Sequence, residues 1–432
     1  MNATRFVVIA AVLGLTILPA AAIGAPPKTP PKTLWVSPAA VSVTPGSCAK
    51  PGYNTIQSAI NAAPAGATIR VCAGTYVEQL QITQAVSLVG VGAVTVQLPA
   101  VPANSTTACD TAPGTGGFQP NQDGVVVCTT GVVNMTGLKI NAAWPSATCD
   151  DSLYGVLVAG GATLNLTSSS IVAAGAVPLN GCQGGVGIQV GMAWTTPVEV
   201  GHANLSNDSV SGYQKNGVTV DGAGSSANVA RTAVTGIGPT TQIAQNGIQV
   251  SNGASARISS STISGDECNV AVCGANALTQ TQSVGVLFFG AASGSSVTSS
   301  KINGNDIGVY NYEATAPTGP AVSVVGDTLA NNRYEGVVLD QGSASVRGDT
   351  ITGGNVGLAV VQYRGQAFAA DGTASQDVIR GASVAAVQVS SDQALTGDFA
   401  GLLTISFSKL SGNAARVLNN SANYVVVQHA NS

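Results

Sequence analysis

The sequence predicts an all-β fold, a right-handed parallel β-helix in which short strands wind into a solenoid of stacked coils. Three observations predict it: a glycine-led apolar motif that recurs along the chain, an aliphatic pair that follows each motif, and helical periodicity confined to one short segment. Only 8% of the 432 residues are charged, whereas 53 are Gly. This composition suits stacked strands joined by tight turns.

The first motif is a Gly followed by alternating apolar residues, at spacings of 21 to 38 residues. Its period is that of a β-strand, so Val218 and Val220 should point inward and Thr219 outward. Asn216 and Asn246 each precede an anchor glycine and are expected to stack as an amide ladder. The anchors are Gly155, Gly187, Gly217, Gly247, Gly285, Gly308, Gly336 and Gly357.

The second motif is a pair of aliphatic residues five positions apart, such as Ile258 with Ile263 and Val297 with Ile302. An odd spacing across two strands implies a bend that returns both side chains to the interior. These residues should therefore stack into two aliphatic ladders. Three coils carry an aspartate in this bend, where other coils carry Ser or Thr. These aspartates are expected to hydrogen-bond the backbone of the turn. They are Asp208, Asp327 and Asp349.

The N-terminus has the pattern of a secretory signal, with Arg5, an apolar run from Phe6 to Leu18 and small residues up to Gly24. We expect residues 1–24 to be a cleaved signal peptide and the mature protein to be secreted, or extracellular. No other apolar segment reaches spanning length, so no membrane span is expected in the mature chain.

Four regions are expected in the mature chain. Residues 25–52 form a Pro-rich linker, and structure begins near Tyr53. Residues 53–100 form an N-terminal cap and the first coils, because Ile56, Ala59 and Ile60 share one face of a short helix that would cover the open end of the solenoid. Residues 101–416 form the parallel β-helix, and residues 417–432 form its C-terminal end.

Eight cysteines, an even number in an exported chain, predict four disulfides. Coils contact only adjacent coils, which favours pairing in chain order, although the sequence leaves other connectivities open. There are no paired CxxC motifs and only two histidines, so no metal or cofactor site is predicted. The favoured pairs are Cys48–Cys72, Cys109–Cys128, Cys149–Cys182 and Cys268–Cys273.

The net charge of −4 is spread thinly, without runs of either sign. Nucleic acid is therefore not expected as a partner. Nothing in the sequence indicates an oligomeric state.

The stretch from Thr55 to Pro64, the segment Gly74-Thr-Tyr-Val-Glu78 and the later coils resemble the pectin-lyase-like family of secreted bacterial β-helix proteins, over about residues 53–390. The resemblance implies polysaccharide as the ligand class. The activity motifs of polygalacturonases, pectin methylesterases and the main pectate lyases are absent, and the pair Asp150-Asp151 lies beside Cys149 in a predicted loop. Whether the protein is an enzyme is left open; if it is one, a polysaccharide lyase or a related carbohydrate-active enzyme is expected.

Candidate site residues are the charged and aromatic side chains that gather at the two ends of the glycine-led strands. A lyase needs a cation to neutralise a uronate and a side chain to act as base or acid. One hypothesis is that these residues line a groove that binds, and cleaves or modifies, a polysaccharide. The alternative is a non-enzymatic extracellular scaffold that acts in structural or surface interactions. The groove candidates are Lys215, Asp221, Tyr312, Arg333 and Asp340.

Overall fold

In the computed structural model, the residues described are 32–39, 41–110, 121–145, 147–149, 152–274, 280–313, 322–362, 370–391 and 400–432. They belong to one unit that spans Lys32–Ser432. The predicted signal peptide and Asp150-Asp151 lie outside these ranges. Within them, no helix combines the length and apolar character needed to cross a membrane.

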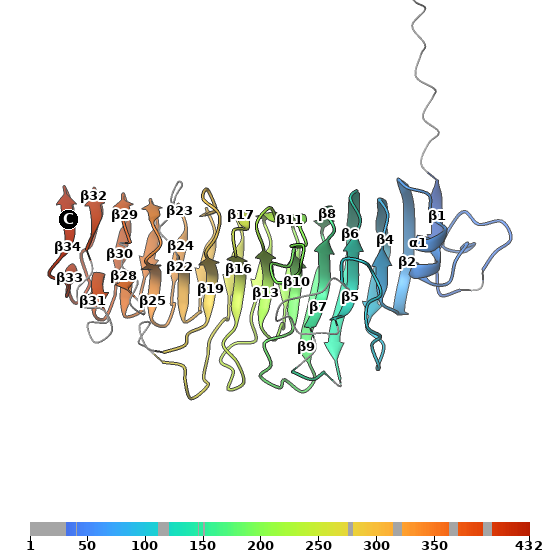
Figure 1. Ribbon diagram of the computed structural model, residues 1–432, viewed down its shortest axis with the longest axis horizontal. Coiled ribbons are helices and arrows are strands. Elements are labelled where there is room, and N and C mark those ends of the chain that lie inside the picture. The colour runs from blue at the N-terminus through green and yellow to red at the C-terminus, as the bar shows by residue number, and fades with distance from the viewer. Residues whose placement is uncertain are drawn as a thin grey trace, which may run out of the picture. The chain divides into compact units, whose positions relative to one another are not determined.

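The chain folds as the predicted right-handed parallel β-helix (Figure 1). All strand pairs between coils are parallel, and they form two sheets. The sheet of twelve strands, here sheet C, consists of β3 (Leu80–Ile82), β5 (Asn121–Cys128), β7 (Ser152–Ala159), β10 (Val186–Val190), β13 (Asn216–Asp221), β16 (Asn246–Ser251), β19 (Val284–Phe289), β22 (Ile307–Tyr312), β25 (Glu335–Asp340), β28 (Val356–Gln362), β31 (Ala385–Ser391) and β33 (Val417–Asn419).

The sheet of 22 strands, here sheet A, mostly receives two short strands from each coil. It consists of β1 (Thr33–Val36), β2 (Ala67–Val77), β4 (Val86–Gln97), β6 (Val132–Trp144), β8 (Ala162–Thr167), β9 (Ser170–Ala176), β11 (Gly201–Ser206), β12 (Ser209–Ser211), β14 (Ser226–Ala230), β15 (Ala233–Thr235), β17 (Ser255–Ser259), β18 (Thr262–Ser264), β20 (Ser296–Thr298), β21 (Lys301–Asn303), β23 (Val322–Val325), β24 (Thr328–Ala330), β26 (Ala344–Arg347), β27 (Thr350–Thr352), β29 (Gly372–Ser375), β30 (Val378–Arg380), β32 (Gly401–Ser406) and β34 (Tyr424–His429).

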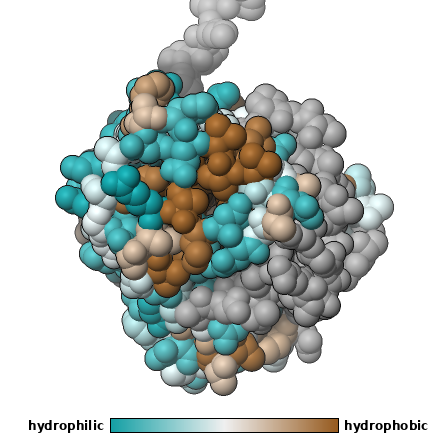
Figure 2. Space-filling model, turned by 90° about the vertical axis from the view of Figure 1, so that its left-hand side faces the viewer, coloured by the Kyte–Doolittle hydropathy of each residue, from teal (hydrophilic) through white to brown (hydrophobic). Residues whose placement is uncertain are grey.

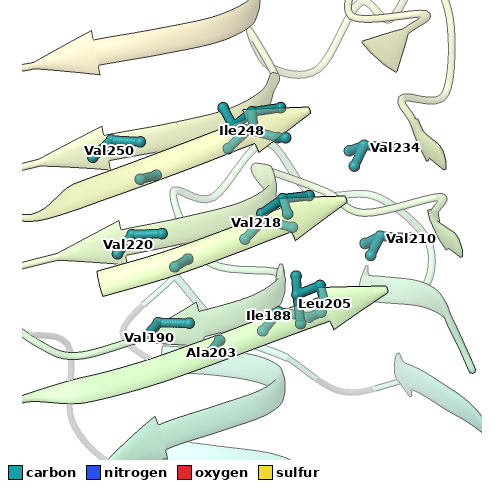
Figure 3. Packing of buried hydrophobic residues seen from close by; sticks show 14 of the residues in the cluster. Ile188, Val190, Ala203, Leu205, Val210, Val218, Val220, Val234, Ile248 and Val250 are labelled. Carbon is teal, nitrogen blue, oxygen red and sulfur yellow. The ribbon is translucent and has the colours of Figure 1, made fainter. Parts of the chain in front are cut away.

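The glycine-led motif forms the strands of sheet C. Val218 pairs with Ile248 and Val220 with Val250, and all four side chains are buried. Figure 3 shows them in two ladders along the core. The anchor is glycine because coils approach closely here: a Cβ on Gly247 would lie 2.6 Å from the carbonyl oxygen of the next anchor.

The aliphatic pairs also stack as predicted. Ile258 pairs with Val297, and Ile263 with Ile302, in two separate ladders of sheet A. Between the paired strands the chain bends through a residue with positive φ, such as Asn207 at 58°. The left-handed backbone at this one position turns the chain sharply enough to bring both aliphatic residues into the core.

The aspartates of the bend bind backbone, which confirms their predicted role. Asp208 Oδ1 accepts a hydrogen bond from the Ser169 amide at 2.8 Å. Asp327 Oδ1 accepts from the Ser300 amide, and Asp349 Oδ1 accepts from the Asp327 amide, both at 2.6 Å. Each of these side chains therefore bonds the backbone of the preceding coil.

At the N-terminal end, α1 (Ile56–Ala62) packs Ile56, Ala59 and Ile60 into the interior. Both carboxylate oxygens of Glu78 accept hydrogen bonds at the start of this helix, from the amides of Ile56 and Gln57 at 2.8 and 2.9 Å. The carboxylate thus gives two amides of the first turn an acceptor and places a negative charge at the helix start. Both effects stabilise the helix.

Regular structure begins upstream of Tyr53, inside the range expected to be a linker. Strand β1 pairs in parallel with β2 because Leu34 and Val36 bury against the first coil. At the other end, β33 and β34 pair with β31 and β32, so strand pairing continues to His429.

The C-terminal end exposes apolar surface (Figure 2). The core residues Val417 and Val426 are only partly buried, and Val425 is 53% exposed. No helix of the described residues lies beside these last strands. The two ends of the solenoid therefore differ in how their core is covered.

All eight cysteines form disulfides, in the pairs that adjacency of coils favours. The Cα–Cα separations range from 4.9 to 6.0 Å across Cys48–Cys72, Cys109–Cys128, Cys149–Cys182 and Cys268–Cys273.

Candidate functional site

A cavity of about 250 Å³ lies on the outer face of sheet C, across β7, β10, β13 and β16. The alternation that sends valines into the core sends every second side chain outward, into this cavity. Its lining residues are Ser152, Tyr154, Gln183, Gly184, Val186, Gln189, Trp194, Asn216, Thr219, Asp221, Gln249 and Asn252.

The amide side chains of the cavity are held by one another. Asn246 Nδ2 donates to Asn216 Oδ1 at 3.1 Å, which is the amide ladder predicted from the sequence. Asn216 Nδ2 donates in turn to Thr219 Oγ1 at 2.9 Å and to Gln249 Oε1 at 3.1 Å. Such a network fixes the orientation of each amide before any ligand arrives.

Asp221, a predicted site residue, ends β13 and lines the cavity. Its Oδ2 accepts a hydrogen bond from the Ala193 amide at 2.7 Å. Its Oδ1 accepts from Ser251 Oγ and from Asn252 Nδ2, both at 2.8 Å. Both oxygens of this buried carboxylate are thus engaged by protein donors.

Two acidic side chains lie buried next to Tyr154. Asp123 on β5 pairs in register with Tyr154, and Asp110 follows Cys109, whose disulfide to Cys128 ties its loop to the same strand. Burial raises the pKa of Asp123 well above its ordinary value, and the Asp110 carboxyl beside it adds to the effect. Burial likewise raises the pKa of Tyr154. Burial and the neighbouring carboxyl thus favour the protonated form of Asp123.

Lys215 precedes β13, at the end opposite Asp221. The two are six residue steps apart along the strand, which corresponds to about 20 Å. The half-buried Lys215 donates from Nζ to the Ala244 carbonyl at 2.9 Å, and burial lowers its pKa to about 8. It does not line the cavity.

Arg333 anchors a loop rather than facing the cavity. Its Nη2 lies 2.7 Å from Asp306 Oδ1 and donates to the Cys268 carbonyl at 2.6 Å. The guanidinium also lies over the Tyr334 ring, 4.6 Å from the centroid. The ion pair fixes the guanidinium, and its hydrogen bond to the Cys268 carbonyl holds the loop of the Cys268–Cys273 disulfide against the coils.

The last two predicted residues, Tyr312 on β22 and Asp340 on β25, lie two and three coils beyond β16 and do not line the cavity. Asp340 is buried and accepts a hydrogen bond from the Tyr310 hydroxyl at 2.6 Å. The Tyr312 ring stacks on Phe289, with 4.7 Å between centroids. The five predicted residues thus divide between the two ends of the strands, Lys215 and Arg333 at one and Asp221, Tyr312 and Asp340 at the other.

Most residues of the cavity were not among the predicted candidates. Gln189 and Gln249 occupy the same outward position in two identical Gly-Ile-Gln-Val motifs, and Thr219 occupies it in the coil between. The repeat itself marked this column, because its outward residue is polar in three successive coils. Tyr154 and Trp194 have no comparable signal in the sequence.

The buried Glu335 was also missed. It lies in the column of Asn216 and Asn246, farther along sheet C, and pairs with Ile307 and Val356. Burial raises the pKa of this carboxyl to about 8.

Fold and cavity together define a class: a right-handed parallel β-helix protein with a polar cavity on the outer face of one sheet. Solved structures share the fold. A variant of the periplasmic alginate epimerase AlgG is 12% identical, with a TM-score of 0.53, over 88% of this chain and 83% of that one. The Agl-KA catalytic domain is 14% identical, with a TM-score of 0.56, over 86% of this chain and 64% of that one.

No protein-family model matches the sequence, and no curated protein matches it. At such low identity, the likeness to the solved structures shows the fold and no activity.

Proposed function

We propose that the cavity of sheet C binds a neutral saccharide chain. The observation that carries the proposal is the lining itself: amides and hydroxyls held in fixed orientations beside two aromatic side chains, Tyr154 and Trp194. Sugar hydroxyls both donate and accept hydrogen bonds, and amide groups complement both roles. Aromatic rings offer flat apolar surface to the C–H faces of a pyranose.

The charge of the lining favours a neutral saccharide over a uronate. Asp221 is the only charged residue among the cavity's lining residues, and none of them is Lys, Arg or His. A uronate carboxylate would lie near this carboxylate without a cation to compensate for its lost hydration. Lys215 and Arg333, the cations considered from the sequence, bind backbone and Asp306 elsewhere.

The geometry supports binding rather than chemistry at this cavity. Both oxygens of Asp221 already accept hydrogen bonds from the protein, and the carboxylate oxygens of Asp123 are buried. The Asp221 oxygens are thus engaged by protein donors, and the Asp123 oxygens are buried away from a reacting atom in the cavity. One protein of like fold is named an alginate epimerase, which supports polysaccharide as the ligand class in general. Four disulfides support folding in an oxidising compartment, as expected for a secreted protein.

The test is an array of neutral and uronate oligosaccharides probed with the disulfide-bonded protein, followed by calorimetry. Gln189→Ala should lower the affinity for neutral oligosaccharides about tenfold, the value of one good hydrogen bond. Gln388→Ala is the matched control, because Gln388 lies in the same outward column on β31, away from the cavity.

Preference for uronates, or equal loss from the two substitutions, would contradict the proposal. A protein that binds no oligosaccharide on the array would favour the alternative of a non-enzymatic scaffold.

A further inference from the structure

We propose that the stacked rings of Phe289 and Tyr312 form a second saccharide subsite, which holds a later sugar of the chain bound in the cavity. This proposal rests on the proposed function. The two rings lie 4.7 Å apart at 21°, and Phe289 is 43% exposed. We call this pair the aromatic platform.

The platform lies in the same column of paired residues as Asp221, which lines the cavity. Asp221 pairs with Ser251, Ser251 with Phe289, and Phe289 with Tyr312. Strands of one sheet are about 4.8 Å apart, so Phe289 lies about 10 Å from Asp221 along the solenoid axis. One coil thus corresponds roughly to one pyranose of an extended chain.

The path between the cavity and the platform is polar and open. Asn252, which lines the cavity and is exposed, holds Asp221 with its side chain and bonds Phe289 O with its backbone amide, at 2.8 and 3.1 Å. Next to Phe289, a Cβ added to Gly290 would meet no atom within 4 Å. A saccharide that leaves the cavity past Asn252 therefore has room to reach the platform.

The chemistry of the platform fits a sugar better than it fits the core. Neighbouring outward side chains of this half of sheet C are buried, as at Ile307 and Val338, whereas Phe289 keeps much of its ring in water. Covering an exposed ring with the C–H face of a pyranose removes apolar area from water on both partners. The simpler alternative is that the stacking only stabilises the ends of β19 and β22.

Chain length separates the two readings. The probes are neutral β-linked oligosaccharides of glucose, xylose, mannose and N-acetylglucosamine, each from disaccharide to hexasaccharide. Phe289→Ala should lower the affinity for the hexasaccharide of the bound series about tenfold and leave the disaccharide unchanged. Phe289→Trp should retain the hexasaccharide affinity. Phe407→Ala is the matched control, because Phe407 is 69% exposed and lies at the bend that follows β32 of sheet A.

Equal effects of Phe289→Ala on the disaccharide and the hexasaccharide, or no effect on either, would overturn the subsite and leave the proposed function standing. Absence of binding by the unaltered protein to every series would overturn both. A fall in melting temperature without a length-dependent loss of affinity would assign the platform a structural role only.

Discussion

The outer face of sheet C differs between its two halves, while the inner face does not. Inward positions are mostly aliphatic in both halves, as at Val218 and Val337. The outward column reads Gln189, Thr219 and Gln249 from β10 to β16. It is mostly apolar from β19 to β28, at Leu287, Val338 and Ala359, and it is polar again at Gln388 on β31. The inward residues thus specify the coil, and the outward ones are free to make a cavity in one half and an apolar cluster in the other.

The largest expected effect concerns the inward positions. Ile263→Asp should destabilise the protein by several kcal/mol, because it leaves a buried carboxylate without a partner. Ser261→Asp, two residues away in the bend, should cost little, since Asp208, Asp327 and Asp349 hold the same place in other coils. Denaturant unfolding at pH 6 measures both. Equal losses would mean that the bend does not accept carboxyl groups generally.

The next effect contrasts the bends of the two halves by pH. Asp327, Asp349 and Asp377 stack in successive coils of the C-terminal half. Burial raises the pKa of Asp349 to about 8 and that of Asp327 and Asp377 to about 6. A raised folded pKa gives stability that is complete below the ordinary value of 3.8 and is lost as pH rises toward 8.

The C-terminal coils should therefore open locally more often at pH 8 than at pH 5. Amide hydrogen exchange, corrected for the intrinsic rate at each pH, measures this opening. Asp349→Asn should flatten this dependence. A steeper dependence in the coils of Thr232 and Ser261, where the bend carries hydroxyls, would contradict the assignment.

Two reciprocal substitutions in the outward column test the difference between the two halves of sheet C. Val338→Thr places a hydroxyl at a fully buried site of the apolar half and should cost about 1–3 kcal/mol. Thr219→Val should change stability less, because Asn216 keeps Gln249 as an acceptor, but should weaken saccharide binding. Thermal unfolding and calorimetry together measure both substitutions; a larger stability loss at Thr219 would reverse the comparison.

The smallest effect is expected on sheet A, where Asn134, Asn165 and Asn204 form an amide ladder on the outside. Asn165 Nδ2 donates to Asn134 Oδ1, and Asn204 Nδ2 donates to Asn165 Oδ1, both at 2.8 Å. Asn165→Ala removes both bonds at a half-exposed site and should cost about 1 kcal/mol. An effect as large as that of Ile263→Asp would show that such ladders, and not only the core, specify the coils.

The fold could be predicted because its determinants repeat. Each coil presents the same inward alternation and the same aliphatic pair, so the sequence alone predicts that Ile263 and Ile302 lie opposite each other. Adjacency of coils likewise favoured the four disulfides. Strand β1 escaped prediction because it is one short strand in a Pro-rich segment and belongs to no repeat.

The site could be predicted only in part, for physical reasons. Lys215, Arg333 and Asp340 stand out as charged residues in a chain poor in charge. Their partners, however, are a backbone carbonyl, the Asp306 carboxylate and a tyrosine hydroxyl, respectively. Whether an outward residue faces a cavity depends on the loops that cross the sheet. The sequences of these loops, such as the one that contains Asp110, do not repeat from coil to coil and so do not predict a cavity. Asp221 was found because its column could be counted from the anchor glycine.

The uneven distribution of cross-links has a mechanical consequence. Each coil is held to the next by a row of hydrogen bonds, and each coil contacts only its neighbours. A force along the solenoid axis therefore breaks these rows one coil at a time. The last cysteine is Cys273, so the coils beyond it have no covalent tie. A molecule pulled by its two ends should therefore unravel first from the C-terminal side, in steps of one coil. In the coils that carry disulfides, each unfolding step should release a shorter length of chain.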